Sequence, residues 1–340
     1  MSRFTRAFHL FGWGSAIGLL LLVLVETWLH TDAFLYRYRS VFAAGRAMDK
    51  LHYVESRMPT LLVLGNSRVD NGFDPCTLLE RGAGNISGFN LGIPGANAGI
   101  LYGLTKRLAD EGRLGAKGVR VVLIGLDENL LQAEDSLDYG VFYSDPSWLW
   151  QNHDWRGILA HSIRLWGFSA NLKQLREPGK ALGFIQSSFT SMEPIGGGAA
   201  EHLGYRAGFG GLQDAEQVHR QQESFNSPPD PIQVKALFAT VALLQRHGVQ
   251  VAVVYPPLLN RELLYLTPQI PAAQPYAAVA GRLADLGIPL LALEPGTQRD
   301  PEMFVNPGHL NDRGAQYYSR LLARLLQVIW PDLYVKEGDK

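Results

Sequence analysis

Short apolar segments alternate with helical patterns along most of this 340-residue chain, and this alternation restricts the fold most strongly. Strands that are buried on both faces read as continuous apolar, β-branched runs. The predicted strands are 60–64, 88–91, 119–124, 249–255 and 288–293. The predicted helices between them are 76–81, 97–110, 233–247, 274–286 and 313–329. We therefore expect an α/β fold in which helices cover both faces of a mostly parallel sheet, with the site at the carboxyl ends of the strands.

The amino-terminal segment predicts a membrane anchor. Residues 1–6 carry two arginines and no acid, and residues 7–25 contain no Asp, Glu, Lys or Arg. A helix of about 20 apolar residues crosses the hydrocarbon core, and basic residues before it favour a cytoplasmic amino terminus. No small-x-small cleavage pattern follows, so an uncleaved anchor is favoured over a removed signal peptide. We expect a single pass through the inner (cytoplasmic) membrane by residues 7–29, with the remaining chain on the periplasmic, or extracytoplasmic, side.

Two residues at the end of this run are expected at the outer interface. Tryptophan is favoured at that depth, which suits Trp28. Glu26 either snorkels to the interface or meets a partner in the membrane. A buried core helix is the alternative for the whole run, but no other segment of the chain is so continuously apolar.

The chain divides into four predicted regions. Residues 1–30 form the cytoplasmic tip and transmembrane anchor, and residues 31–55 form a helical stalk. The core consists of 56–134 and 232–340, with an insertion or lid at 135–231 between them. The insertion holds four tryptophans that form either a platform for sugar rings or, more commonly, the insertion's own small core. They are Trp148, Trp150, Trp155 and Trp166.

Composition and the motifs that the sequence lacks argue against several classes of function. A net charge of -1 gives no electrostatic reason to expect nucleic acid as a partner. Cys76 is the only cysteine, so no intramolecular disulfide can form, and we expect it to pack as a small apolar side chain. No glycine-rich dinucleotide fingerprint or phosphate-binding loop occurs, so no cofactor is predicted. No metal site is predicted, because the histidines of the insertion lack metal-ligand spacing. These are His153, His161, His202 and His219.

Two residues far apart in the sequence indicate a nucleophile and its base. Ser67 follows the first predicted core strand directly, and His309 lies just before the last predicted helix. A serine needs a base to take its proton and hydrogen-bond donors where negative charge develops. The loop after the second predicted strand contains glycines whose backbone N–H groups can approach an oxyanion. Gly95 is the better candidate donor and Gly92 the second.

Four segments, in this order, resemble the motif blocks of the SGNH, or GDSL-like, hydrolase superfamily. They are Gly65-Asn66-Ser67-Arg68, Gly92-Ile93-Pro94-Gly95, Gly125-Leu126-Asp127-Glu128 and Asn306-Pro307-Gly308-His309. The resemblance leaves the insertion and the anchor unmatched. It implies a flavodoxin-like three-layer sandwich with Ser67 as nucleophile and His309 as base, and with backbone N–H groups of Ser67 and Gly95 as oxyanion donors.

Two positions depart from the family pattern. Asp127 stands where the family has an oxyanion asparagine, and a carboxylate cannot donate; its alternative role is to pair with Arg68. Asn306 stands where the family has the aspartate that orients histidine, although its amide oxygen can still accept from the imidazole. Three interpretations follow. Another acid serves, with Asp300 and Asp312 nearest; the serine and histidine work as a pair; or catalysis is lost and a binding cleft remains.

The resemblance and the anchor together predict a membrane-anchored, extracytoplasmic esterase or O-acyltransferase that acts on an envelope polysaccharide or other glycan. The layout is similar to SGNH-type proteins of alginate O-acetylation and teichoic acid D-alanylation, which implies a membrane-bound O-acyltransferase as a partner. The alternative is a non-catalytic glycan-binding or envelope assembly protein that keeps the fold. A soluble cytoplasmic lipase is a third interpretation, disfavoured by the anchor and by the absence of a Gly-x-Ser-x-Gly elbow.

Overall fold

The chain forms two compact units. The computed structural model describes residues 3–79, 86–133, 140, 142–190, 201–209, 215–220, 227–294 and 298–333. Over its described residues, the anchor unit comprises Met1–Met48, Leu137–Phe142 and Pro146–Met192. The sheet unit comprises Asp49–Ser136, Tyr143–Asp145 and Glu193–Lys340, again over its described residues. Residues 1–2 of the predicted cytoplasmic tip, residues 80–81 of the predicted helix 76–81, and parts of the predicted insertion lie outside the described residues.

A five-stranded parallel sheet forms the centre of the sheet unit, with the strand order β2-β1-β3-β4-β5. The strands are β1 (Leu61–Gly65), β2 (Gly88–Gly92), β3 (Val121–Gly125), β4 (Gln250–Tyr255) and β5 (Leu290–Ala292). Gly65 at the end of β1 is in register with Gly92 at the end of β2, so both strands end at the same edge. Each predicted strand is confirmed to within two residues at either end, and the predicted α/β fold with a parallel sheet is confirmed.

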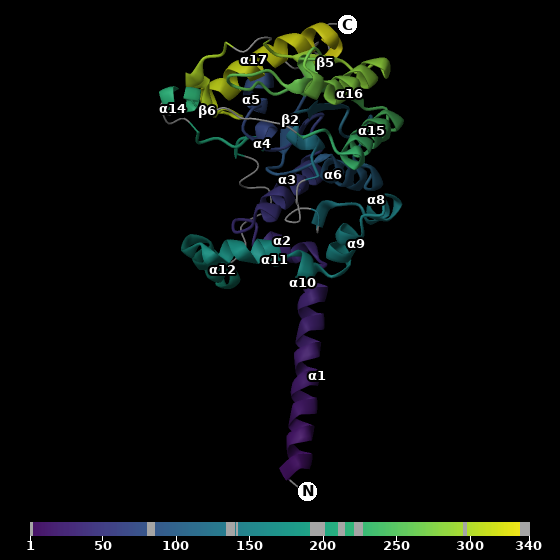
Figure 1. Cartoon of the computed structure of the whole chain (residues 1–340), viewed down its shortest axis with the longest axis vertical. Helices are drawn as coiled ribbons and strands as arrows, with labels where there is room; N and C mark the ends of the chain where they lie inside the picture. The colour runs from purple at the N-terminus through teal and green to yellow at the C-terminus, as the bar shows by residue number, and fades with distance from the viewer. Residues whose placement is uncertain are drawn as a thin grey trace. The chain divides into compact units, whose positions relative to one another are not determined.

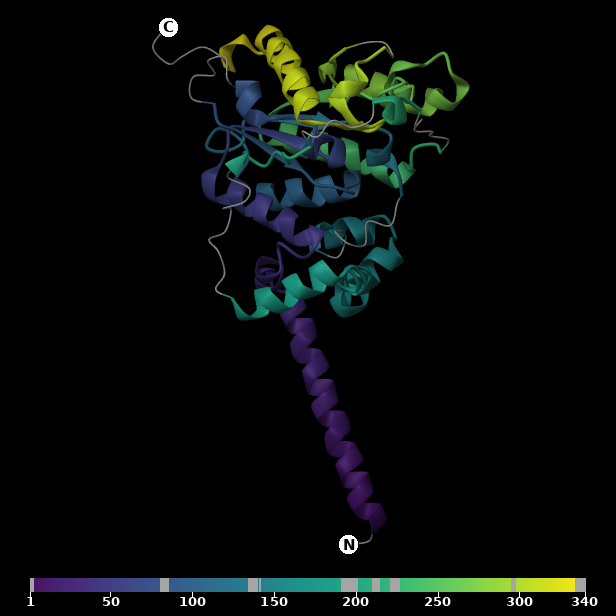
Figure 2. The same cartoon turned by 90° about the vertical axis from the view of Figure 1, so that its left-hand side faces the viewer.

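Helices cover both faces of this sheet. The helices of the sheet unit are α3 (Ala43–Arg57), which begins in the anchor unit, α4 (Ser67–Asp70), α5 (Pro75–Leu79), α6 (Ala98–Asp110), α14 (Ala215–Arg220), α15 (Pro231–Arg246), α16 (Gln274–Asp285) and α17 (Asp312–Ile329). Short 3-10 turns are η1 (Asn129–Leu131), η3 (Leu264–Leu266), η4 (Pro271–Ala273), η5 (Pro301–Met303) and η6 (Pro331–Leu333). Figure 2 shows α17 on one side of the sheet and α6 with α15 on the other.

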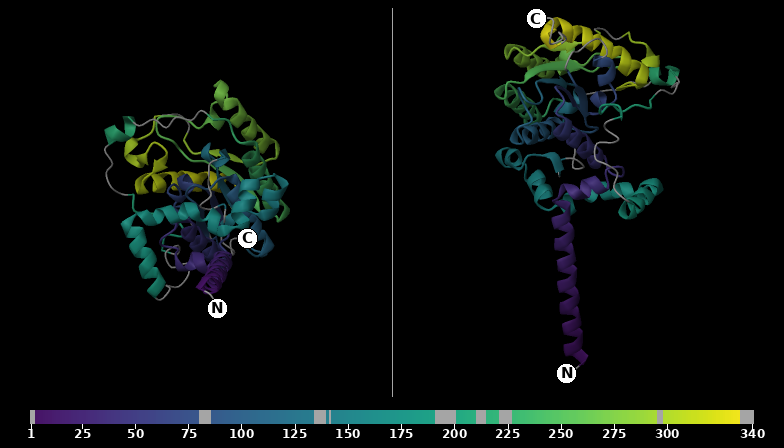
Figure 3. Two further views of the ribbon diagram at one scale, coloured as in Figure 1. Left: turned by 60° about the horizontal axis from the view of Figure 1, so that its bottom comes forward. Right: turned by 180° about the vertical axis from the view of Figure 1, so that it is seen from behind.

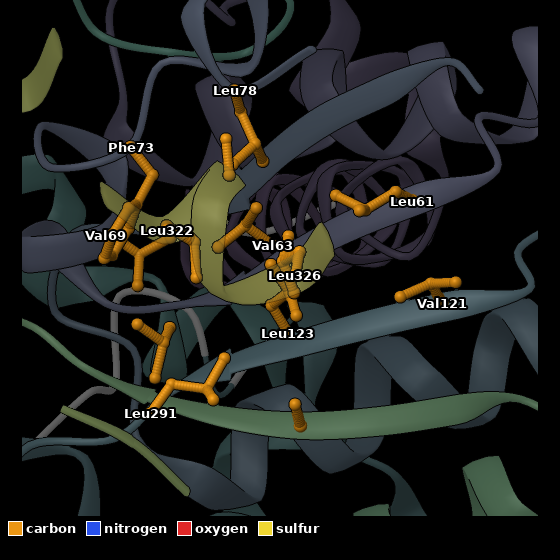
Figure 4. Packing of buried hydrophobic residues seen from close by; sticks show 13 residues of the cluster. Leu61, Val63, Val69, Phe73, Leu78, Val121, Leu123, Leu291, Leu322 and Leu326 are labelled. Carbon is orange, nitrogen blue, oxygen red and sulfur yellow. The ribbon is translucent and has the colours of Figure 1, made fainter. Parts of the chain in front are cut away.

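The core under α17 follows from side-chain periodicity. Leu61 and Val63 are two residues apart on β1 and therefore point to the same face of the sheet. Leu322 and Leu326 are four residues apart on α17 and pack over that face together with Leu123 of β3 (Figure 4). All five side chains are buried, and each contributes about 2 kcal/mol of hydrophobic stabilisation. The cluster fixes α17, and with it the loop that precedes α17, against the sheet.

Two short elements beside this core do not appear among the predicted ones. A two-stranded antiparallel hairpin is formed by β6 (Phe304–Asn306) and β7 (His309–Leu310), where Asn306 pairs with His309. The helix α4 begins at Ser67, directly after β1. Strands of two or three residues and a helix of four are too short to show an apolar period, so the sequence carries no signal for them.

The predicted insertion contributes to the free edge of the sheet. The backbone N–H of Asn90 on β2 donates to the carbonyl of Leu203 at 2.9 Å. Gly204 follows with φ +82°, and a Cβ there would collide with the Asn90 carbonyl, so glycine is required. The N–H of Arg206 donates to the Asp70 carbonyl at 2.9 Å. Residues 203–206 therefore run along the edge strand β2.

The anchor unit consists of helices. These are α1 (Arg3–Leu29), α2 (Asp32–Arg37), α8 (Pro146–Gln151), α9 (Trp155–Ser162), α10 (Arg164–Gly167), α11 (Ser169–Leu172), η2 (Lys173–Arg176) and α12 (Pro178–Phe189). The segment Gly12–Leu29 of α1 is long and apolar enough to cross a membrane. Figures 1 and 3 show α9, α10 and α12 grouped at the Leu29 end of α1.

An aromatic cluster changes the interpretation of the predicted stalk. Phe34 and Phe42 each lie 5.0 Å, ring centre to ring centre, from Phe168. The ring of Tyr38 stacks on Phe184 at 4.3 Å. Residues 31–55 thus include two helices, α2 and α3, and the aromatic side chains of α2 and of the turn between the helices pack against the insertion. The sequence shows which face of a helix is apolar but not which segment covers it.

Two further expectations about single residues differ from the structure. Cys76 lies on α5, but its thiol is exposed rather than packed. Trp148 is buried, whereas Trp150, Trp155 and Trp166 are each about half exposed. Three of the four tryptophans therefore do not form a core for the insertion, because the aromatic cluster with residues 34–42 takes that place.

Candidate active site

Ser67 is placed by the junction of β1 and α4. The side chain of Asn66 caps α4 by accepting from the N–H of Arg68 at 3.0 Å, which makes Ser67 the first helical residue. Val69 packs against Gly65 and Gly125, at the ends of β1 and β3, so closely that a Cβ on either glycine would overlap its side chain. The chain therefore turns sharply at Gly65, and Ser67 stands at the carboxyl edge of the sheet.

His309 reaches Ser67 from the hairpin before α17. Its Nε2 lies 2.8 Å from Oγ of Ser67, and its Nδ1 lies 3.0 Å from Oδ1 of Asn306. The N–H of Gly308 donates to the same Oδ1 at 3.0 Å, which identifies this atom as the amide oxygen. An oxygen acceptor requires a proton on Nδ1, so Nε2 carries the lone pair and accepts from the serine hydroxyl. This is the tautomer in which histidine can act as a general base.

The two nearest acids have other partners. The Asp312 carboxylate accepts from the hydroxyl of Tyr205 at 2.6 Å and from the N–H of Gly208 at 3.1 Å. Burial and this carboxylate raise the pKa of Tyr205, so its hydroxyl keeps the proton that it donates. Asp300 caps η5 and pairs with Arg313 at 3.5 Å. The Nδ1 position behind the histidine is held by Asn306.

Asp127 is engaged inside the protein. Both of its oxygens accept from Nδ2 of Asn66, at 2.9 and 2.8 Å, and one accepts from the N–H of Leu130 at 2.9 Å. Nη1 of Arg68 lies 3.5 Å away, as the alternative role proposed from the sequence requires. Burial raises the pKa of the Asp127 carboxyl, against the opposing effects of Arg68 and Asn66. Asp127 thus fixes Asn66, and through it the turn that presents Ser67, instead of facing the serine as a donor.

Glu128 extends this buried polar group. Its carboxylate accepts from Arg261 at 2.9 Å and from the N–H of Leu264 at 2.8 Å, and Nη1 of Arg68 lies 3.6 Å from it. Arg68 therefore lies between Asp127 and Glu128, and Arg261 pairs with Glu128. Pairing offsets the cost of burying these charges, which would be several kcal/mol for each unpaired ion.

The two candidate oxyanion glycines lie in different surroundings. The N–H of Gly92 donates to the side chain of Asn90 at 2.8 Å and is therefore occupied. Gly95 is exposed and has φ +78°, in a loop whose first residue, Ile93, donates to the Gly65 carbonyl at 2.9 Å. This bond holds the loop beside the end of β1. The role of Gly95 as an oxyanion donor remains a prediction.

Two buried polar residues that support the site were missed in the sequence. Asn90 donates to the carbonyls of Val69 and Phe73, both at 2.7 Å, and so ties β2 to α4. Nζ of Lys50 donates to Asp70 and to the Gly92 carbonyl, both at 2.6 Å. An asparagine within the otherwise apolar run Phe89-Asn90-Leu91 is a signal that could have indicated a structural role, because a buried amide needs partners.

Comparison with models of known protein families and with curated protein sequences finds no match for this chain. Within the ranges that the structure describes, no group of three or more His, Cys, Asp or Glu side chains is arranged to hold a metal ion.

Proposed function

We propose that this chain is an SGNH-like serine esterase or O-acyltransferase, anchored in the inner (cytoplasmic) membrane by α1, with the sheet unit on the extracytoplasmic side. The observation that carries the proposal is the 2.8 Å hydrogen bond between Ser67 and Nε2 of His309, with Asn306 fixing the tautomer. A serine bonded to a correctly oriented base is the minimum that acyl transfer through serine requires.

The order of the elements supports the same proposal. The strand order β2-β1-β3-β4-β5 is the order of flavodoxin-like sheets, in which ligands bind at the carboxyl ends of the strands. Ser67 follows β1, the Gly95 loop follows β2, and His309 precedes α17. These are the segments whose sequences resemble SGNH motif blocks.

The proposed reaction proceeds through an acyl-serine. Oγ of Ser67 forms a bond to the carbonyl carbon of an acyl ester while its proton passes to Nε2 of His309. Negative charge on the carbonyl oxygen is met by the N–H groups of Ser67 and Gly95. The proton on Nε2 then passes to the leaving oxygen as the ester bond breaks. In the second half, the oxygen of a glycan hydroxyl or water bonds to the acyl carbon while His309 takes its proton. His309 then gives that proton to Oγ of Ser67 as the acyl–serine bond breaks.

The anchor suggests the substrate and the partner. An active unit held at the outer face of the membrane meets envelope glycans, and a membrane-bound O-acyltransferase is the proposed source of activated acyl groups. The two arginines at the amino-terminal end of α1 favour this orientation.

A serine-directed label tests the chemistry. Full-length protein in detergent is treated with a fluorophosphonate and assayed with p-nitrophenyl acetate. We expect covalent labelling that is lost in Ser67→Ala and falls about 100-fold or more in rate in His309→Ala. Ser56→Ala, at an exposed position on α3, is the matched control and should label normally. Unchanged labelling of Ser67→Ala would refute the assignment of the nucleophile.

A non-catalytic glycan-binding or envelope assembly protein is the second candidate. It is favoured by the inward bonding of Asp127 and by an amide in place of the orienting acid. It predicts that wild-type protein neither labels nor hydrolyses acetyl esters, and that cells carrying folded Ser67→Ala keep the wild-type phenotype. Loss of the phenotype on this single change would exclude it.

A further inference from the structure

We propose that the anchor unit makes a second contact with the membrane, in which the exposed apolar sides of α9, α10 and α12 lie on the outer surface of the phospholipid bilayer. This interfacial surface is defined by Trp155, Leu159, Trp166, Leu182, Ile185 and Phe189. The inference rests on α1 crossing a bilayer and does not depend on the chemistry at Ser67.

One part of the surface belongs to α9 and α10. Trp155 and Leu159 are four residues apart on α9, so they share one side of that helix. Their side chains are 61% and 47% exposed, and Trp166 on α10 is 46% exposed. The next residue along, Ala160, is buried, so α9 has one side turned inward and an apolar side left uncovered.

The other part belongs to α12. Leu182, Ile185 and Phe189 have the spacing i, i+3, i+7 and therefore line one side of the helix, where Phe189 is 87% exposed. Phe184 points elsewhere and stacks on Tyr38. The helix thus has one apolar side packed within the anchor unit and another facing outward. A row of exposed apolar side chains on one side of a helix is typical of an interaction site.

Hydrogen bonds to α1 place this surface at the end of the membrane span. The Glu26 carboxylate accepts from the N–H groups of Arg164 and Leu165, at 2.6 and 2.9 Å. The Arg164 guanidinium donates to the carbonyl of Leu29, the last residue of α1, at 2.8 Å. The start of α10 is therefore fixed to the last turn of α1. Figures 1 and 2 show α9, α10 and α12 running across α1 at this end instead of along it.

The charge and composition of this segment favour lipid over a protein as the occupant. Residues 146–189 contain two acidic and five basic residues. Tryptophan, together with basic side chains, is typical of helices that lie in the headgroup region, and basic residues are attracted to anionic lipids. The five basic residues are Arg156, Arg164, Lys173, Arg176 and Lys180.

Fluorescence quenching in proteoliposomes tests the proposal. Full-length Cys76→Ser protein carries one environment-sensitive label, at Ile185→Cys or Phe189→Cys, in phosphatidylcholine with and without phosphatidylglycerol. The control label is Asp110→Cys, on an exposed side chain of α6. At the two α12 positions we expect iodide quenching at least threefold weaker than at the control, and strong quenching by lipids with a nitroxide near the headgroup. Phosphatidylglycerol should strengthen the second effect.

Two results would overturn the proposal. Iodide quenching as strong at Phe189→Cys as at Asp110→Cys, without lipid quenching, would place the surface in water. Protection from both quenchers would place a second copy of the chain on it. Both labelled side chains are largely exposed, so the substitutions should leave the fold intact. The readout needs no enzyme activity, so failure here and failure of the proposed function are separate outcomes.

Discussion

The side-chain oxygen of Asn306 is neutral and accepts two hydrogen bonds, one from Nδ1 of His309 and one from the backbone N–H of Gly308. A neutral acceptor selects the productive tautomer as well as a carboxylate does. The amide stabilises the protonated histidine ring less than a carboxylate would, because no negative charge then faces the imidazolium. Cysteine proteases that orient histidine with asparagine have the same arrangement. The site is therefore expected to be competent but slow.

Replacing Asn306 tests this view. Asn306→Asp should raise the rate of fluorophosphonate labelling of Ser67 about tenfold or more, because a carboxylate would stabilise the imidazolium. Asn306→Ala should lower the rate, since Nδ1 loses the acceptor that it has at 3.0 Å. The measurement is the rate of fluorophosphonate labelling of the wild type and of both variants. Equal rates for Asn306→Ala and wild type would show that the amide does not orient the base.

Asp127 supports the turn at Ser67 from inside. Asp127→Ala would leave the Asn66 amide, the Leu130 N–H and the Arg68 guanidinium without this buried acceptor. We expect a loss of about 3 kcal/mol in the free energy of unfolding, measured by urea titration of the full chain in detergent. Asp110→Ala removes an exposed partner of Lys106 and should cost less than about 1 kcal/mol. A small effect at both positions would contradict a supporting role for Asp127.

At the scale of elements, whether the sequence predicts a helix or a strand depends on how buried and how long that element is. The strands β1 to β4 are buried nearly throughout, so continuous apolar runs revealed them. The long helices were recognisable from their helical apolar period, whereas α4 and the β6–β7 hairpin are too short to carry a period. The sequence order alone suggested that Ser67 and His309 meet at the sheet edge. It could not show that Asp127 turns inward, because the direction of a side chain after a strand depends on neighbours such as Asn66.

The contact between α4 and the two strand ends gives a prediction for the junction. Gly125→Ala would place a methyl group within the Val69 side chain and should cost about 1–3 kcal/mol in the free energy of unfolding. Val69→Ala combined with Gly125→Ala should cost less than the sum of the two single changes, since the smaller side chain makes room. Gly281→Ala, on α16 with open space around it, is the control and should not destabilise. Additive costs in the double variant would argue against this contact.

At the scale of the whole molecule, the predicted insertion serves both units. Its residues 146–190 pack with the segments around α1, and its residues 203–206 lie along β2. One stretch of sequence without strand and helix alternation is thus divided between two compact bodies. Sequence periodicity does not contain this information, since it describes each helix alone.

The junction between α1 and α10 gives a prediction for the anchor unit. Glu26→Ala removes the acceptor of two backbone N–H groups, those of Arg164 and Leu165. Hydrogen exchange at these amides, measured by mass spectrometry on the full chain in nanodiscs, should become about tenfold faster or more. His30→Ala removes only a neighbour that bonds to Glu26 at 2.9 Å and should leave the exchange nearly unchanged. Equal exchange in all three proteins would show that Glu26 does not hold α10.

The strip formed by Leu203 and Gly204 along β2 has a consequence for solubility. An open edge strand offers unpaired N–H and C=O groups to any other strand, and this is a common route to aggregation. The carbonyl of Leu203 accepts a hydrogen bond from the N–H of Asn90, and Gly204 lies against the Asn90 carbonyl. The middle of the β2 edge is therefore already covered. A chain shortened between residues 193 and 227 would expose that edge to other copies of itself. By covering part of this edge, the insertion should reduce strand pairing between copies of the chain.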